Sequence, residues 1–265
     1  AMLGTIMQIL ATIVLVFIVF GHLLFTMGGG TLFTDLALAA MGKYRGGPAK
    51  VAVIGSAFFG SISNSAVANV VITGSVTIPM MKRIGYRPAI AGAIEATAST
   101  GGLVTPPVMS AVAFVMAEYL QMPYGQIVIA AIIPALLYYG ALLIQVDLEA
   151  GRTGMRGLEP DEIPNVWDVL KKGWPFLIPL PVLIYTLVWL LWQPETAGMF
   201  ATFVLIACGY WFVRDKTWQW WYDTLADAGV QVTEIIIVGL LVGLILGATS
   251  MTGLSFTLTE PLLLL

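Results

Sequence analysis

Charged residues are scarce in this sequence. Only 10% of its 265 residues are Asp, Glu, Lys or Arg, while 58% are hydrophobic and the mean hydropathy is +0.91. Soluble domains carry about 25% charged residues. A composition this apolar, with runs long enough to cross lipid, predicts an all-α integral membrane protein.

Cysteine and histidine are almost absent. The single cysteine, Cys208, excludes a disulfide framework, and it lies too far from the single histidine, His22, to share a metal site with it. We interpret His22 as a hydrogen-bonded packing residue, because it lies in an apolar span. Without a Gly-x-Ser-x-Gly motif beside that histidine, a membrane-embedded hydrolase is the weakest alternative, and we predict that the chain is not an enzyme.

A polar tail is also missing at both ends. The sequence begins inside an apolar run and ends on Pro261 followed by four leucines. We therefore expect it to be a piece of a longer protein.

The few basic residues fall into five clusters, and basic clusters near span ends mark the cytoplasmic side of a membrane protein. The clusters are Lys43, Arg45 and Lys50; Lys82, Arg83 and Arg87; Arg152 and Arg156; Lys171 and Lys172; and Arg214 and Lys216.

One long apolar run, residues 51–81, has a basic cluster at each end. A single crossing needs about 20 residues, fewer than this run contains. A helical hairpin that enters and leaves on the cytoplasmic side would keep both clusters inside. The middle of the run, residues 60–69, is small and polar, which suits a re-entrant tip that contacts protein or water.

The remaining runs complete a first transport repeat over residues 1–150. It contains a span before Gly28, an interfacial helix, the hairpin, a broken helix over 88–120 and a span over 126–146. Gly101-Gly102 and Pro106-Pro107 break the fourth element, since proline interrupts a helix.

The second half of the sequence predicts fewer elements. Residues 151–173 form a cytoplasmic linker, 174–216 two scaffold spans, and 217–265 a truncated start of a second repeat. Similar sequences follow Met27 and Met251, at the ends of spans of opposite predicted direction. This favours an inverted repeat, a common design of secondary transporters.

Polar residues at the tip and the break are the candidate substrate or ion site, because unwound backbone at membrane depth binds ions and anions. Tight helix packing and a proline kink closed by neighbouring helices are the alternatives. The candidates are Ser61, Ser63, Asn64, Ser65, Asn69, Ser99, Thr100, Gly101, Gly102, Thr105, Pro106 and Pro107.

Glu95 lies inside the predicted broken helix. An intramembrane carboxylate is a candidate proton carrier or ion ligand. The alternative is a structural pair with Arg87 or with hydroxyls near Thr97 and Ser99.

The sequence contains several longer motifs, at residues 46–50, 63–69, 78–86, 96–102, 106–109 and 133–139. Together these motifs resemble one family, the large membrane subunit of tripartite ATP-independent periplasmic (TRAP) transporters, in the fused form that works with TAXI-type binding proteins.

The resemblance implies an elevator-type symporter in the bacterial or archaeal inner membrane. It would cross the lipid bilayer several times and import a small organic anion, typically a carboxylate, delivered by a periplasmic binding protein. A small membrane subunit, fused N-terminally in some members, would be a second partner, and nucleic acid is not expected. The coupling ion would be Na⁺ or H⁺, and no other cofactor is implied.

The family pattern also implies a Na⁺ site near Ser63, Ser65, Gly101 and Thr105. The usual tip reads Ser-Gly-Ser, whereas this chain has Asn64 at the middle position. The runner-up function is a channel-like or scaffold membrane subunit, which passive, unsaturable flux would distinguish from coupled uptake.

Overall fold

The computed structural model describes residues 4–63, 65–213 and 217–253. These residues form helices and connecting turns without a strand, which confirms the all-α prediction. Three helical stretches in the described ranges are long and apolar enough to cross a membrane: Met7–Met41, Tyr124–Thr153 and Trp218–Thr249. The chain is an all-α membrane protein.

The first stretch is helical throughout but kinked. It comprises α1 (Thr5–Ile9), η1 (Leu10–Val14), α2 (Leu15–Leu24), η2 (Phe25–Gly29) and α3 (Gly30–Met41). Gly28 causes the kink, because its φ of 128° is a backbone conformation that residues other than glycine rarely adopt. The sequence predicts the end of the first span at this glycine, and the direction of the helix changes here.

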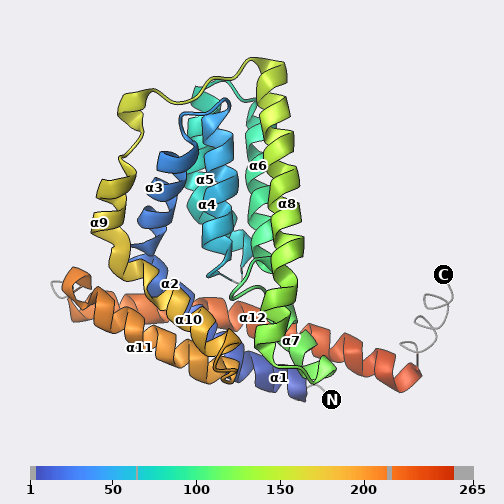
Figure 1. Ribbon diagram of the computed structural model, residues 1–265. Coiled ribbons are helices and arrows are strands. Elements are labelled where there is room, and N and C mark those ends of the chain that lie inside the picture. Colours follow the sequence, from blue (N-terminus) through green and yellow to red (C-terminus); the bar gives the residue numbers. More distant parts are fainter. Residues whose placement is uncertain (1–3, 64, 214–216, 254–265) are drawn as a thin grey trace.

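The predicted hairpin consists of α4 (Gly47–Gly60) and α5 (Ala66–Arg83). The two helices pack side by side and run in opposite directions (Figure 1). Gly46 precedes α4 with a φ of 64°, and Pro48 lies in the first turn, where its missing N–H costs nothing. Ser65 caps α5 by accepting a hydrogen bond from the Ala68 N–H at 3.2 Å.

The broken helix is present as α6 (Pro88–Gly101), η3 (Gly102–Val104) and α7 (Ala111–Leu120), and α8 (Tyr124–Thr153) follows it. The unwound segment contains a cis Pro106–Pro107 bond. In Figure 1, α6 and α8 stand upright beside the hairpin, and both contact α4. The hairpin, α6 and α8 therefore form one bundle.

The second half contains η4 (Pro160–Glu162), α9 (Val166–Leu177), α10 (Pro179–Val188), α11 (Pro194–Val213) and α12 (Trp218–Thr252). The sequence predicts the first of the two scaffold spans over residues 174–192, but it is divided between α9 and α10, because Pro179 starts a new helix. The sequence also predicts an interfacial helix over 218–227 and a span from 229 to about 250. The two form one continuous α12, since no proline lies between them. Whether these elements belong to scaffold and repeat stays a prediction.

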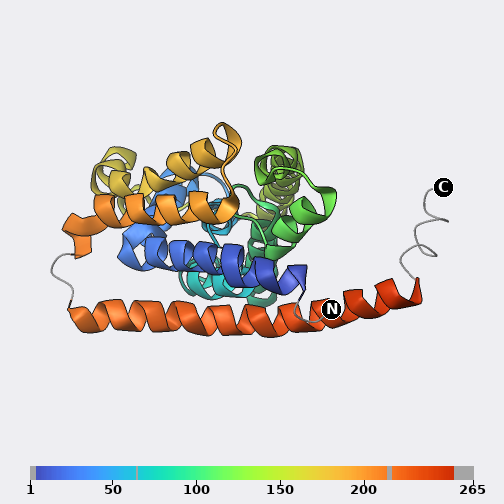
Figure 2. The same cartoon turned by 90° about the horizontal axis from the view of Figure 1, so that it is seen from below.

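A second layer of helices crosses beneath the upright bundle (Figure 1). Seen from below in Figure 2, α11 and α12 lie on opposite sides of α1 and α2, and both contact α2. Apolar side chains of α2, α7, α10 and α11 form one core, and those of α4, α6 and α8 form the other. The hairpin tip points toward the first of these cores.

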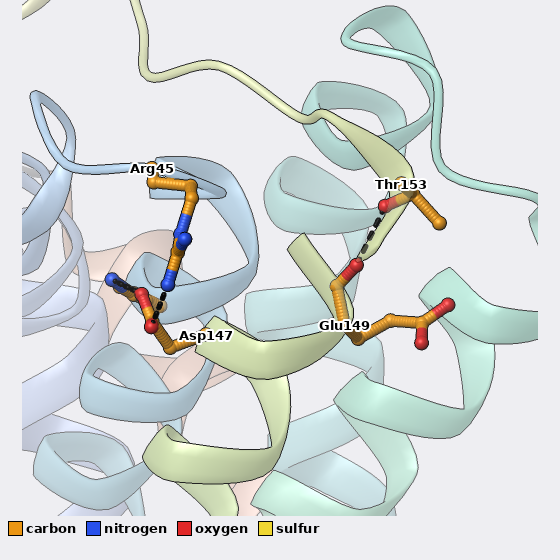
Figure 3. A network of polar contacts seen from close by, with 5 residues as sticks. Arg45, Asp147, Glu149 and Thr153 are labelled. Atoms are coloured by element: carbon orange, nitrogen blue, oxygen red, sulfur yellow. Dashed lines mark hydrogen bonds and ion pairs between the residues drawn. The ribbon is translucent and has the colours of Figure 1, made fainter. Parts of the chain in front are cut away.

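Basic residues gather at the open end of the hairpin, where α4 begins and α5 ends. Arg45 and Lys50 both pair with Asp147 near the end of α8, and Arg152 pairs with Glu149 at 2.8 Å. Figure 3 shows Arg45 paired with Asp147, and the Thr153 hydroxyl, which donates to the Glu149 carbonyl at 2.7 Å. Three predicted clusters therefore share one end of the bundle, and which side of a membrane that end faces stays a prediction.

Candidate functional site

The hairpin tip lies directly against the break in the α6–α7 helix. A Cβ atom built on Gly60 would be 2.3 Å from the Cα of Gly102, so only glycine allows the two backbones to approach so closely. The Val108 N–H also donates a hydrogen bond to the Ser61 carbonyl at 3.2 Å. The two segments predicted to share a site are therefore in contact.

The tip hydroxyls bind their own backbone. Ser61 donates to the Phe58 carbonyl at 2.7 Å, and the Ser63 hydroxyl accepts from the Ser65 N–H at 3.3 Å. Asn64, the residue that departs from the family pattern, lies outside the described residues. Ser63 and Ser65 lie next to each other at the tip.

Asn69 is 1% exposed and lies one turn into α5. Its side-chain amide donates to the Ser56 carbonyl at 3.0 Å, across the hairpin. The geometry thus makes Asn69 a bridge between the two arms, with the Gly102 backbone beside it.

The residues of the break divide into two groups. Thr105 donates to the Gly101 carbonyl at 2.8 Å, and the Tyr124 hydroxyl bonds to the carbonyls of Pro107 and Val108 at 3.1 and 2.6 Å. These bonds satisfy backbone groups that the break leaves free. Four other candidates differ from these in position: Thr100 is exposed, Ser99 faces the hairpin arms, Gly102 packs on the tip and Pro106 is half-buried.

A metal centre of the usual kind is not evident in this part of the chain. The described residues contain no group of three or more His, Cys, Asp or Glu side chains that could hold a metal ion. Sodium binding at Ser63, Ser65, Gly101 and Thr105 would rely on hydroxyl and carbonyl oxygens. It stays a prediction.

A small cavity of about 120 Å³ lies between α2, the hairpin tip and α12. His22 lines this cavity, and its Nδ1 is 3.0 Å from the Gln231 side-chain amide. Its Nε2 is buried without a hydrogen-bond partner. The predicted hydrogen-bonded role of His22 agrees with this geometry. Gln231 was missed, although a lone amide in an apolar helix could have indicated it.

Glu95 is 0% exposed and is surrounded by hydroxyl groups from three helices. Ser56 of α4 and Ser99 of α6 lie 3.1 and 3.3 Å from its Oε1. Thr73 and Thr77 of α5 contact Oε1 and Oε2. Glu95 thus joins both hairpin arms to the broken helix.

This environment decides between the two structural pairings considered for Glu95. Within the described ranges, no ion pair involves Glu95, and Arg87 lies exposed at the start of α6. The partners of Glu95 are hydroxyl groups, which agrees with the predicted pairing to hydroxyls near Thr97 and Ser99. Thr73 and Thr77 were missed, although their four-residue spacing places them on one helical face.

Comparison with models of known protein families identifies the family of this chain. The family model "Tripartite ATP-independent periplasmic transporter, DctM component" matches residues 1–265. This chain belongs to that family. Its members are transporter permeases, which agrees with the prediction of a transport protein.

Curated relatives agree with this assignment. An uncharacterised protein, y4mL of Sinorhizobium fredii, is 28% identical over 80% of the chain and 51% of its own length. The isethionate TRAP transporter permease protein DctMQ of Oleidesulfovibrio alaskensis is 28% identical over 80% of the chain and 34% of its own length. The C4-dicarboxylate TRAP transporter large permease protein DctM of Pseudomonas aeruginosa is 34% identical over 51% and 31%. The chain spans about half the length of such relatives, or less.

Proposed function

We propose that this chain is part of the permease of a secondary active transporter that imports a small organic anion. The contact between the hairpin tip and the broken helix carries the proposal. It brings Ser61, Gly102 and Val108 together at a point where two chain segments are unwound. Unwound backbone of this kind supplies the amides and carbonyls that bind substrates and ions in secondary transporters.

A carboxylate is the substrate class that we favour. The relatives bear the names of permeases for C4-dicarboxylates, for isethionate and for 2,3-diketo-L-gulonate, all small organic anions. An anion of this size can accept hydrogen bonds from N–H groups and hydroxyls such as those at the tip and the break.

The proposed partners are a periplasmic substrate-binding protein and a small membrane subunit. The name DctMQ of one relative is consistent with fusion of the small subunit to the large one. The TAXI-type pairing belongs to this proposal, as do the inner-membrane location, the elevator-type movement and the inverted repeat.

The test is uptake by the full-length permease, reconstituted in liposomes with its small subunit and its binding protein. Radiolabelled succinate, 2-oxoglutarate, glutamate and isethionate are offered as a panel, with and without an ion gradient. Saturable, gradient-dependent accumulation that requires the binding protein supports the proposal. Unsaturable flux independent of any gradient would refute it and favour a channel-like subunit.

A further inference from the structure

We propose that Glu95 is the proton-binding group of this permease, so that the coupling ion is H⁺. The inference rests on the proposed transport function and names the ion that drives it. It is carried by the chemistry around the Glu95 carboxyl, which lies between α4, α5 and α6 with no exposed surface.

Among the residues that the structure describes, none provides a counter-ion for a negative charge at this site. The charged groups on the packed helices lie at their far ends: Lys50 of α4 pairs with Asp147 of α8, and Lys82 and Arg83 end α5. Tyr138 and Tyr139 of α8 donate to the carbonyls of Thr97 and Ala98. Burying the charged carboxylate costs more than burying the neutral carboxylic acid.

The hydroxyls can serve both charge states of the carboxyl. Thr73 lies 2.7 Å from the Asn69 carbonyl and Thr77 lies 3.0 Å from the Thr73 carbonyl, in addition to their contacts with Glu95. Each hydroxyl has one hydrogen, so it can donate either to its backbone carbonyl or to the carboxylate.

Hydrogen counting then gives two complete arrangements. When Glu95 is ionised, Thr73, Thr77, Ser56 and Ser99 can all donate to its oxygens. When Oε2 binds a proton, the new O–H bond donates to the Thr77 oxygen, and Thr77 turns its hydrogen to the Thr73 carbonyl. Release breaks that O–H bond, leaves the electron pair on Oε2 and transfers the proton to a water molecule. Both states are hydrogen-bonded, which a reversible proton carrier requires.

A proton suits the contacts at this position. The hydroxyl oxygens contact the carboxyl oxygens directly, so a proton can be bound there without any movement of the surrounding groups.

The carboxyl is also connected to the tip and the break. Ser56 makes two of the connecting contacts: its hydroxyl contacts Glu95, and its carbonyl accepts a hydrogen bond from the Asn69 side chain. Asn69 in turn lies beside Gly102. Binding or loss of the proton can therefore change how the two hairpin arms pack near the proposed substrate site.

The first test compares net accumulation with exchange in the reconstituted full-length system, with the membrane potential clamped at zero. A pH difference of about one unit can support up to about a tenfold concentration ratio per coupled proton. We expect Glu95→Gln to lose this accumulation but to exchange internal for external substrate well above empty liposomes, since exchange needs no proton release. Glu95→Asp should recover part of the accumulation with a shifted pH profile. Gly92→Ala on the same helix, where a Cβ meets nothing within 4 Å, is the matched control.

Accumulation by Glu95→Gln equal to that of the control would overturn the inference. Loss of both exchange and accumulation in both Glu95 variants would also overturn the inference, because the residue would then have a structural role. Wild-type uptake driven by Na⁺ alone, without movement of protons, would overturn it and leave the proposed function intact.

A second measurement does not depend on the substrate. Infrared difference spectra of the purified permease between alkaline and acid pH should contain a protonated-carboxyl C=O band that Glu95→Gln removes. A spectrum unchanged by the substitution would refute proton binding at Glu95 even if no carboxylate of the panel is transported, in which case the proposed function fails separately.

Discussion

Gly60→Ala tests the contact between the hairpin tip and the broken helix. The added Cβ would lie 2.3 Å from the Gly102 Cα, whereas carbon atoms in contact prefer about 3.5–4.0 Å. The obstacle is backbone on both sides, so no flexible side chain can move out of the way. The tip and the break must therefore separate by more than about 1 Å.

We estimate the cost of this overpacking by comparison with soluble proteins, in which an extra methyl group in a well-packed core lowers the free energy of unfolding by about 1–3 kcal/mol. With about 2–4 °C per kcal/mol for a chain of this size, the melting temperature should fall by several degrees. We expect the loss of uptake to exceed what the loss of stability alone would cause, because the strain is placed at the proposed substrate site.

The assay is thermal melting of the detergent-purified full-length permease, with uptake measured on the same preparations. Gly92→Ala is the control, since the added methyl group meets nothing within 4 Å and should stabilise the helix by about 0.5–1 kcal/mol. Equal melting temperatures and equal uptake for Gly60→Ala and Gly92→Ala would refute the close approach of the two backbones.

Two further substitutions address the groups that hold the site together. Tyr124→Phe removes the hydroxyl whose one hydrogen is shared between the Pro107 and Val108 carbonyls, and a net loss of about 0.5–1.5 kcal/mol should appear as lower thermal stability. Asn69→Ala removes the bridge from α5 to the Ser56 carbonyl and should cost about 1–3 kcal/mol, as measured by the same melting assay. A melting temperature at the wild-type value in either variant would show that the bond in question contributes nothing.

Strong local signals allowed much of the fold to be predicted. Gly28 and the pair Pro106–Pro107 interrupt apolar runs, and the helices change direction or end near them. The hairpin was predicted because a run too long for one crossing had basic residues at both ends. In each case one residue type has a conformational or electrostatic consequence that needs no tertiary contact.

The rest depended on packing, which the sequence does not display. Ser56, Thr73 and Glu95 are far apart in the chain and meet only because α4, α5 and α6 pack together. The contact between Ser99 and Glu95 is an exception, because the two residues lie four positions apart on α6 and share one helical face. The continuity of α12 could not be predicted either, since interfacial and spanning segments differ in composition but not in local helical preference.

Cysteine accessibility is the most direct test of the central claim, that α4 and α5 form a re-entrant hairpin. On full-length protein with Cys208 replaced, single cysteines are introduced as Tyr44→Cys before α4, Arg87→Cys after α5 and Tyr119→Cys near the end of α7. Tyr44 and Tyr119 are 47% and 65% exposed, so a reagent can reach both positions. For a re-entrant hairpin, we expect labelling of positions 44 and 87 from the cytoplasmic side and of position 119 from the opposite side. Labelling of positions 44 and 87 from opposite sides would contradict it, because residues 51–81 would then be an ordinary membrane span.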